Sequence, residues 1–314
     1  MQNLKEAANF LREKDFFCFF FHKNLDGDTV GAALALFYAL KQLGKKAIIK
    51  TVNDEFLEKF GFLYPLKEEK EDLFKICHYV AVDVADTKLL GENFKYKIDL
   101  VIDHHFSNKL DCKIKCIDAN KAATCEIIYY ILKELNLKIT KQIANCLYVG
   151  IVTDSGCFKF ENTTANTHKI AADLIEKGAD FANINFRMFN CKTKERLQLE
   201  KEILENLEYF FNDRCVIVFI TKEIIKKTKV SEEDCGSIAD IAASFKDSVI
   251  AITAKQDEDL FKLSVRTKYD FDASLFCKSF KGGGHKKAAG CVVKGTEEEV
   301  KRIILKKIEE VFSF

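Results

Sequence analysis

The amino-acid sequence predicts an α/β protein with two domains. The chain has 314 residues, more than the roughly 250 residues at which a single hydrophobic core usually stops growing. Up to residue 185, short apolar runs alternate with helical patterns, which is typical of a mainly parallel sheet flanked by helices. A stretch rich in Lys, Glu and Leu follows and predicts a connecting helix. We expect domains at 1–188 and 213–314, joined by a helical linker at 189–212.

The predicted elements of the first domain begin with a strand, a loop and a helix. Phe16–Phe21 is a continuous apolar run and indicates a buried strand. From Asp28 to Leu40 apolar residues recur at helical spacing, and Gly44 offers a stop for that helix. Further strands are expected at 47–52, 79–84 and 100–102, and further helices at 122–135, 141–152 and 165–177.

The second domain is predicted to be smaller and α/β, with a mixed sheet. The linker helix is expected to run from Thr193 to Phe211, where Lys and Glu can form salt bridges along its faces. Strands are expected at 215–220, 249–254 and 261–265, and a closing helix at 300–312. The chain contains one proline, so few loop signals mark the ends of these elements.

Composition excludes several classes of ligand. Hydrophobic residues make up 48% and charged residues 31% of the chain, the balance of a folded globular protein. The 49 Lys and Arg residues nearly cancel the 48 Asp and Glu residues, so no strong overall field would hold long duplex DNA. The apolar runs fall short of the roughly 20 residues that a membrane helix needs. We expect neither long DNA nor a membrane as a partner.

The 12 cysteines are expected to be reduced thiols. They are scattered over a long chain without a signal peptide, whereas disulfide scaffolds are short and secreted. Cys112 and Cys116 lie close together, but no second pair at zinc-finger spacing completes a tetrahedral site. These features predict a cytoplasmic protein. The oligomeric state stays open, a homodimer included.

Carboxylates and imidazoles gather where the predicted elements end. The first strand runs into His22, Asp26 and Asp28, with Gly27 allowing a tight turn between the two acids. This composition is typical of a metal site, although Asp28 could instead cap the helix and Asp-Gly could form a turn. Asp83 stands at the end of another apolar run, where a carboxylate is costly unless it is paired or bound to metal.

Two further segments repeat this arrangement. Asp103, His104 and His105 follow a predicted strand, and Asp154 ends an apolar stretch. Open α/β sheets gather ligands at the carboxyl ends of their strands, so one shared site explains four such segments better than four local causes. The expected metal ligands are His22, Asp26, Asp28, Asp83, His104 and Asp154.

These six side chains suit two divalent cations. Four carboxylates would offset the charge of the two ions, with Asp83 as the natural bridge. Imidazole and carboxylate without thiolate favour Mn²⁺, with Mg²⁺ as the alternative, over a structural zinc. Two ions roughly 3.5 to 4 Å apart can share a hydroxide, direct it at phosphorus and neutralise the leaving oxygen. The expected chemistry is hydrolytic phosphoryl transfer.

The four segments resemble the motifs of the DHH superfamily, named for the triplet present here at residues 103–105. The resemblance implies that one metal ion is held by His22, Asp26 and Asp83. It implies that the other is held by Asp28, Asp83, His104 and Asp154.

The resemblance also assigns roles to the rest of the triplet. It implies that His105 faces the substrate phosphate and that Asp103 orients the histidine pair through hydrogen bonds. The catalytic residues expected on this basis are Asp83, Asp103, His104 and His105.

The second domain resembles the DHHA1 domain through its glycine-rich segment at 282–290. Successive glycines would let a ligand approach backbone N–H groups, although a polar turn without a ligand is the alternative. Arg266 matches an arginine that members of the family direct at a substrate phosphate, and an exposed strand-end charge is its alternative. The expected substrate-binding residues are His105, Arg266, Gly282, Gly283, Gly284 and His285.

A DHH domain followed by a DHHA1 domain in a chain of this length resembles the nanoRNase and pAp-phosphatase subgroup. This implies hydrolysis of very short RNA or DNA oligonucleotides, including dinucleotides such as pGpG, to mononucleotides, of pAp to AMP, or of both. The alternatives are an inorganic pyrophosphatase of the DHH type, against which the glycine-rich segment argues, and a non-catalytic nucleotide- or RNA-binding module, against which the complete ligand set argues.

Three positions depart from the subgroup's usual pattern. Leu25 replaces a proline, Lys159 stands where arginine is common, and Leu89 occupies a position that often carries an arginine. Lys88 could supply a positive charge next to Leu89, although its ammonium group is a point charge and lacks the planar geometry of an arginine guanidinium group. None of these positions is an expected metal ligand.

Overall fold

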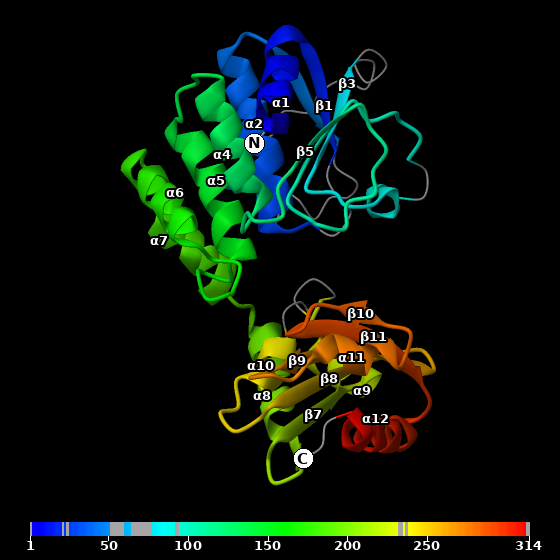
Figure 1. Cartoon of the computed structure of the whole chain (residues 1–314). Coiled ribbons are helices and arrows are strands. Elements are labelled where there is room, and N and C mark those ends of the chain that lie inside the picture. Colours follow the sequence, from blue (N-terminus) through cyan, green and yellow to red (C-terminus); the bar gives the residue numbers. More distant parts are fainter. Residues whose placement is uncertain are drawn as a thin grey trace. The chain divides into compact units, whose positions relative to one another are not determined.

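The computed structural model describes residues 2–311 except 21, 23–24, 51–59, 64–76, 92–93, 232–234 and 236–237. The chain divides into two compact units, Met1–Cys191 (unit 1) and Lys192–Phe314 (unit 2). Each unit has its own sheet and its own apolar core (Figure 1). The sheet of unit 1 is parallel and that of unit 2 is mixed, which confirms the predicted α/β class.

Five parallel strands form the sheet of unit 1, in the order β2-β1-β3-β4-β5. Their bounds are β1 Phe16–Phe20, β2 Lys46–Lys50, β3 His78–Val82, β4 Leu100–Asp103 and β5 Ile114–Ile117. The chain adds β2 on one side of β1 and then returns to add β3 on the other. In open parallel sheets, ligands bind outside the carboxyl ends of the strands at this point of reversal.

Helices cover one face of this sheet (Figure 1). These are α1 Gln2–Glu13, α2 Gly27–Gln42, α4 Thr124–Glu134 and α5 Lys141–Asp154, and α6 Ala165–Glu176 and α7 Phe181–Asn185 pack against α5. A π-helical turn at Phe186–Asn190 follows α7, and a 3-10 turn at Thr87–Leu90 buries Leu90 in the apolar cluster of the opposite face. Across the described ranges, no helix combines the length and apolarity required to span a bilayer.

The strands divide their side chains between two apolar layers. Phe17 and Phe19 of β1 pack into the core beneath the helices, whereas Cys18 and Phe20 join a cluster on the opposite face. Because both faces are buried, such a strand is a continuous apolar run in the sequence. The predicted strand at 16–21 is therefore confirmed as far as Phe20, since residue 21 lies outside the described ones.

Helices α2 and α5 approach each other through glycines. A Cβ atom on Gly31 would lie 2.2 Å from the carbonyl oxygen of Cys146 in α5. Gly27 is equally restricted, since its Cβ would lie 2.4 Å from Oγ1 of Thr153. The expected tight turn at Gly27 is wrong, because this residue already belongs to α2 and lacks a left-handed φ. Close helix packing is what requires glycine there.

Unit 2 contains a six-stranded sheet in the order β10-β11-β9-β8-β7-β6, where only β7 and β8 pair in parallel. The strands are β6 Glu208–Phe210, β7 Cys215–Ile220, β8 Ile250–Asp257, β9 Leu260–Thr267, β10 Gly283–Gly284 and β11 Ala288–Lys294. The helices are α8 Lys194–Glu205, α9 Lys222–Thr228, α10 Ala239–Ala243, α11 Ala273–Lys278 and α12 Glu297–Val311. Apolar clusters lie on both faces of the sheet.

Two elements differ from expectation. The helix predicted over Thr193–Phe211 ends at Glu205, because residues 208–210 pair with β7 instead. Its buried side chains Leu199 and Ile203 pack into the core of unit 2. The amino-terminal helix α1 was not predicted, although its buried residues recur at helical spacing: Leu4, Ala7, Ala8 and Leu11.

Candidate metal centre

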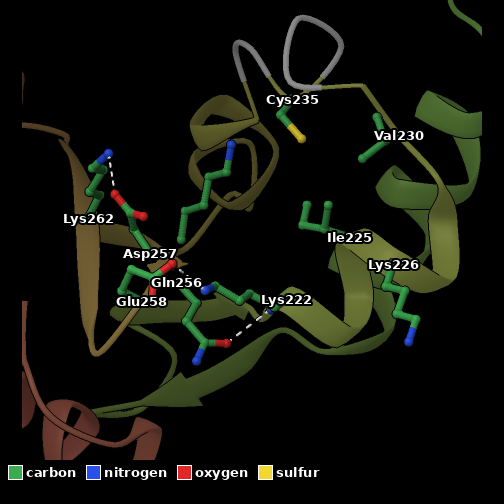
Figure 2. Close-up of a pocket in the computed structure, with 10 residues that line it drawn as sticks. Lys222, Ile225, Lys226, Val230, Cys235, Gln256, Asp257, Glu258 and Lys262 are labelled. Atoms are coloured by element: carbon green, nitrogen blue, oxygen red, sulfur yellow. Dashed lines mark hydrogen bonds and ion pairs between the residues drawn. The ribbon is translucent and has the colours of Figure 1, made fainter.

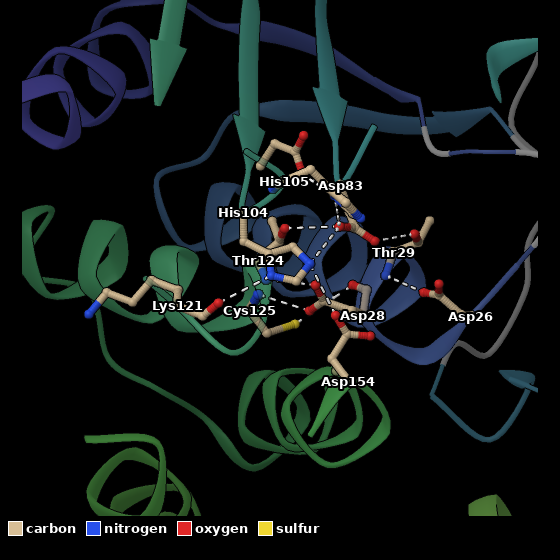
Figure 3. A network of polar contacts seen from close by, with 12 residues as sticks. Asp26, Asp28, Thr29, Asp83, His104, His105, Lys121, Thr124, Cys125 and Asp154 are labelled. Atoms are coloured by element: carbon tan, nitrogen blue, oxygen red, sulfur yellow. Dashed lines mark hydrogen bonds and ion pairs between the residues drawn. The ribbon is translucent and has the colours of Figure 1, made fainter. Parts of the chain in front are cut away.

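All six expected ligands lie together at the carboxyl ends of β1, β3 and β4. Figure 3 shows Asp28, Asp83 and Asp154 turned toward His104. Three groups of side chains offer ligand atoms that lie within 4.8 Å of one another, and their members are His22, Asp26 and Asp83; Asp28, His104 and Asp154; and Asp83, His104 and His105. The structure thus brings together residues that are far apart in the sequence.

The first group joins the loop after β1 to the end of β3. His22 Nε2 lies 3.3 Å from Asp26 Oδ2 and 3.8 Å from Asp83 Oδ2. The other oxygen of Asp26 accepts a hydrogen bond of 2.9 Å from the backbone N–H of Thr29, so Asp26 caps α2. One oxygen of Asp26 therefore fixes the helix while the other faces His22.

Asp28 is buried in the first turn of α2. Its carboxylate accepts hydrogen bonds from the backbone N–H groups of Thr124, at 2.6 Å, and Cys125, at 2.9 Å. These groups lie at the N-terminus of α4, where the helix dipole favours negative charge. Capping of α2 by Asp28 is thus wrong, since Asp26 has that role. Burial, with repulsion from Asp83 and Asp154, still holds the pKa of Asp28 well above its usual range.

His104 links the second group to β4. Its Nε2 lies 3.1 Å from Asp154 Oδ2, and its Nδ1 lies 3.2 Å from the carbonyl oxygen of Lys121. A carbonyl partner at Nδ1 orients the ring and leaves Nε2 directed at the carboxylates. Burial opposes the charged form, but the hydrogen bond to Asp154 and nearby carboxylates raise the pKa of His104 to about 10. The ring therefore carries a proton where a cation would fit.

Asp83 lies between the groups and belongs to two of them. It is 2% exposed, its Oδ2 accepts a 2.6 Å hydrogen bond from Thr29 Oγ1, and its Oδ1 accepts one of 3.1 Å from Thr124 Oγ1. Its backbone has a φ of 57°, a left-handed conformation that is uncommon outside glycine and that clusters at functional sites. Burial, with repulsion from Asp26 and Asp154, raises the pKa of Asp83 to about 6.

Asp103 holds His105 in place. Its Oδ1 lies 2.8 Å from Nδ1 of His105 and accepts a 3.2 Å hydrogen bond from the His105 backbone N–H. Its Oδ2 accepts a 2.6 Å hydrogen bond from Asn108 Nδ2. The hydrogen bond to Asp103 raises the pKa of His105, whose side chain is 45% exposed. Asp103 therefore orients the second histidine of the triplet, while the Lys121 carbonyl group orients the first.

The donor set fits divalent cations. The raised pKa values of Asp28, Asp83 and Asp154 have burial as their main cause, with repulsion between the carboxylates adding to it. A cation would relieve this repulsion. Nδ1 of His22 is buried and has no hydrogen-bond partner among the residues that the structure describes, whereas Nε2 lies 3.3 Å from Asp26 Oδ2 on the side where the carboxylates gather. The neighbouring thiol of Cys125 has a pKa well above its usual range because it is buried, so it stays neutral.

The stability of the metal-free protein is expected to fall as the pH rises from about 4 to about 10. Asp83 binds its proton more tightly in the folded state, so its stabilisation is complete below its ordinary pKa of 3.8 and is lost as the pH passes about 6. His104 behaves in the same way between 6.5 and about 10. Calorimetric melting in a chelator across this range measures the effect.

The matched variant for this prediction is Asp83→Asn, which should make the profile less steep between pH 4 and 6, where Asp28 and Asp154 still contribute, and should retain most of the fall above pH 7. A wild-type melting temperature that stays level or rises over the whole range would contradict the assigned protonation states.

In unit 2, Arg266 lies on β9 beside the glycine-rich segment. It pairs in register with Ala288 of β11. Its Nε lies 3.1 Å from Asp240 Oδ1 in α10, and its side chain is 33% exposed. Arg266 is thus neither free nor fully solvated, and a substrate phosphate would have to compete with Asp240 for the guanidinium group.

The glycine-rich segment forms a β-hairpin. Gly283 and Gly284 pair with Gly290 and Ala289, and the backbone groups of His285 and Ala288 exchange hydrogen bonds of 2.8 and 3.2 Å. The segment is therefore a regular turn between paired strands.

The three glycines differ in their surroundings. A Cβ on Gly282 would lie 2.3 Å from the Gly290 carbonyl oxygen, and one on Gly284 would lie 2.6 Å from that of Ala288. Gly283 has no atom within 4 Å of its Cβ position. Packing against β11 requires two of the glycines, whereas the Cβ position of Gly283 is open.

Sequence reasoning missed the groups that position the ligands. Thr29 and Thr124 hold Asp83 by their hydroxyl groups, and the Lys121 carbonyl group orients His104. Thr29 directly follows Asp28, and Thr124 begins a helix, so both could have been suspected. The carbonyl group of Lys121 has no sequence signature, because every residue carries one.

A pocket of about 470 Å³ lies within unit 2 (Figure 2). Its lining includes two ion pairs. Lys222 Nζ lies 3.1 Å from Glu258 Oε1, and Lys262 Nζ lies 2.6 Å from Asp257 Oδ2. None of the described residues that line it belongs to the expected site. The lining also includes Lys226 and Lys255, so four lysines stand against two acids and the lining residues carry a net positive charge.

Comparison with known proteins now adds to this geometry. Residues 17–151 match the family model described as "DHH family, N-terminal domain", and residues 212–313 match the "DHHA1 domain" model. A bifunctional oligoribonuclease and PAP phosphatase NrnA from Thermus thermophilus is 28% identical over 280 residues, which covers 88% of this chain and 83% of that protein. A protein of the same name from Bacillus subtilis is 23% identical, covering 88% of this chain and 89% of its own.

A solved structure agrees over the whole chain. An exopolyphosphatase-related protein from Bacteroides fragilis superimposes with a TM-score of 0.84 at 21% identity, covering 99% of this chain and 96% of that one. RecJ from Thermus thermophilus, solved with Mn²⁺, has a TM-score of 0.56 at 15% identity and is covered over 54% of its length. The chain therefore belongs to the DHH family and carries a DHHA1 domain in unit 2.

Proposed function

We propose that this protein is a metal-dependent phosphodiesterase that hydrolyses very short oligonucleotides to mononucleotides and pAp to AMP. The observation that carries the proposal is the cluster in which Asp83 is shared by two groups of metal-capable side chains. The names of the curated relatives support the substrate class. We further propose a cytoplasmic enzyme with two divalent cations, Mn²⁺ before Mg²⁺.

The residues of the cluster would divide the two cations between them. His22 and Asp26 would hold one, and Asp28, His104 and Asp154 the other, with Asp83 bridging both. Divalent cations bound there would supply Lewis acidity toward phosphate and toward water. The paired hydroxyl groups of Thr29 and Thr124 would keep both oxygens of Asp83 aimed at the centre.

The surroundings of His105 support a role toward the substrate. Its Nδ1 is engaged by Asp103 at 2.8 Å, which leaves Nε2 for a phosphate oxygen. The raised pKa of His105, caused first by the Asp103 hydrogen bond, favours the protonated ring that an anionic group would attract. We propose that His105 binds the scissile phosphate, and that Arg266, His285 and the backbone at Gly282, Gly283 and Gly284 bind the rest of the substrate.

A matched substrate series tests this proposal. Purified protein with Mn²⁺ is expected to release mononucleotides from dinucleotides and AMP from pAp, more slowly from longer oligonucleotides, and to lose all activity in a chelator. Mg²⁺ in place of Mn²⁺ shows which cation supports turnover. Faster turnover of pyrophosphate than of any dinucleotide would point to a pyrophosphatase instead. Tight binding of dinucleotides without turnover in any divalent cation would reject catalysis.

A further inference from the structure

A phenylalanine next to the metal centre is almost wholly solvent-exposed. Phe106 directly follows His105, and 94% of its surface is exposed, more than that of any other large hydrophobic side chain in the described ranges. Every other large apolar side chain in that set is buried by at least a quarter of its surface. Single exposed apolar side chains are common on protein surfaces. What distinguishes Phe106 is its place directly after His105, whose ring Asp103 holds beside the metal-capable cluster.

The turn that carries Phe106 is held from both sides. The backbone N–H of Asn108 donates to the carbonyl oxygen of His105 at 3.3 Å, which closes a turn with Phe106 at its second position. The side-chain amide of Asn108 donates to Asp103 Oδ2 at 2.6 Å and to the Val84 carbonyl oxygen at 2.8 Å. The exposed ring therefore belongs to a turn that Asn108 ties to Asp103.

The surroundings of the ring indicate the chemistry of its ligand. Consecutive Cα atoms are about 3.8 Å apart, so the side chains of Phe106 and His105 leave the backbone next to each other, and His105 Nδ1 lies 3.6 Å from Asp83 Oδ1. A ligand with its phosphate at His105 would therefore bring its neighbouring group to Phe106. Among phosphate esters, nucleotides carry a flat aromatic group one sugar away from the phosphate, and such bases stack on exposed aromatic rings.

We propose that Phe106 is the stacking platform for the nucleobase that neighbours the scissile phosphate. This inference rests on the proposed function and names its specificity element. Every base has a π face, so the contact would accept any base and would favour the larger purines. It would also explain how a site built mainly from charged groups selects nucleotides over simpler phosphates.

The test compares Phe106→Ala with Phe181→Ala. Phe181 begins α7 and is 46% exposed. The backbone N–H of the preceding residue, Asp180, donates a hydrogen bond to Asn145 Oδ1 near the start of α5. Asn145 is more than two helical turns away from Asp154. Both variants remove an exposed ring, so both should fold like the wild type and melt at the same temperature.

Binding is measured by titration with AMP and with ribose 5-phosphate, which lacks the base, in Mg²⁺ buffer. Phe106→Ala is expected to weaken AMP binding about tenfold, the loss of one base stack, and to leave ribose 5-phosphate unchanged. Wild-type protein and Phe181→Ala should shift the base proton resonances of AMP upfield, and Phe106→Ala should not. For dinucleotides, KM should rise about tenfold with kcat retained, more for purines than for pyrimidines.

Several results would overturn the inference. The first is an AMP affinity of Phe106→Ala equal to that of the wild type, and the second is an equal loss of affinity for ribose 5-phosphate. The third is a change of oligomeric state in Phe106→Ala, measured by sedimentation, which would assign the ring to a contact between copies of the chain. The proposed function can fail separately from this inference. If AMP stacks on Phe106 but no dinucleotide is hydrolysed, catalysis is refuted and the stacking role of Phe106 stands. If dinucleotides are hydrolysed equally well by Phe106→Ala, the stacking role is refuted and catalysis stands.

Discussion

Asp83→Asn is expected to abolish divalent-cation binding and to lower dinucleotide hydrolysis by roughly a thousandfold or more, since a shared metal ligand contributes several kcal/mol to the barrier. The amide keeps the shape of the side chain and can still pair with the hydroxyl groups of Thr29 and Thr124. It removes the negative charge that both groups of ligands share. Calorimetric titration with Mn²⁺ and a steady-state assay measure the two losses.

The same variant should be more stable than the wild type when no metal is present. Wild-type Asp83 is buried and repelled by Asp26 and Asp154, and those effects raise its pKa to about 6; at pH 8 the folded protein carries that unfavourable charge, and asparagine does not. Asp111→Asn, an exposed position in the same unit, is the matched control and should change neither property. Unaltered Mn²⁺ affinity in Asp83→Asn would refute the bridging role.

Gly31→Ala is expected to destabilise unit 1 by on the order of 3 kcal/mol, and to lower its melting temperature by roughly 10 °C. The new methyl group would lie 2.2 Å from the Cys146 carbonyl oxygen, and backbone of α5 cannot swing aside as a flexible side chain can. The sign is informative, because alanine is normally the better helix former by about 1 kcal/mol. Urea unfolding followed by circular dichroism gives the change in free energy.

Gly44→Asn provides the comparison for Gly31→Ala. Gly44 follows the C-cap of α2 with a φ of 70°, and no atom lies within 4 Å of its Cβ position. Asparagine tolerates that conformation, so stability should change little. If Gly31→Ala were as stable as the wild type, α2 and α5 could not be in the contact described above.

Much of the fold was predictable because both faces of the first sheet are buried. Buried parallel strands such as β1 and β4 are uninterrupted apolar runs, which stand out without knowledge of their partners. The short strand β6 was not predictable, since residues 208–210 extend a Lys- and Glu-rich pattern and become a strand only by pairing with β7. Gly31 illustrates the same limit, because a mid-helix glycine has no explanation until α5 lies against it.

The candidate site was predictable as far as side-chain chemistry reaches. Asp83 and His104 belong to residue types that bind metals, and their places at strand ends pointed to one edge of the sheet. What the sequence could not supply is orientation. The division of labour between Asp103 and the Lys121 carbonyl group, and the left-handed backbone at Asp83, depend on backbone geometry that only tertiary packing determines.

The wide spacing of the site residues along the chain has a consequence for biosynthesis. His22 leaves the ribosome early, whereas Asp154 arrives with the last turn of α5. Translation proceeds at about 5–20 residues per second, so several seconds separate the emergence of Asp83 from that of Asp154. During that interval the nascent chain has an incomplete set of ligand carboxylates, and α2 lacks its main packing partner. Cofactor loading and the burial of α2 therefore wait for the same helix, and a chain released before α5 would lack both.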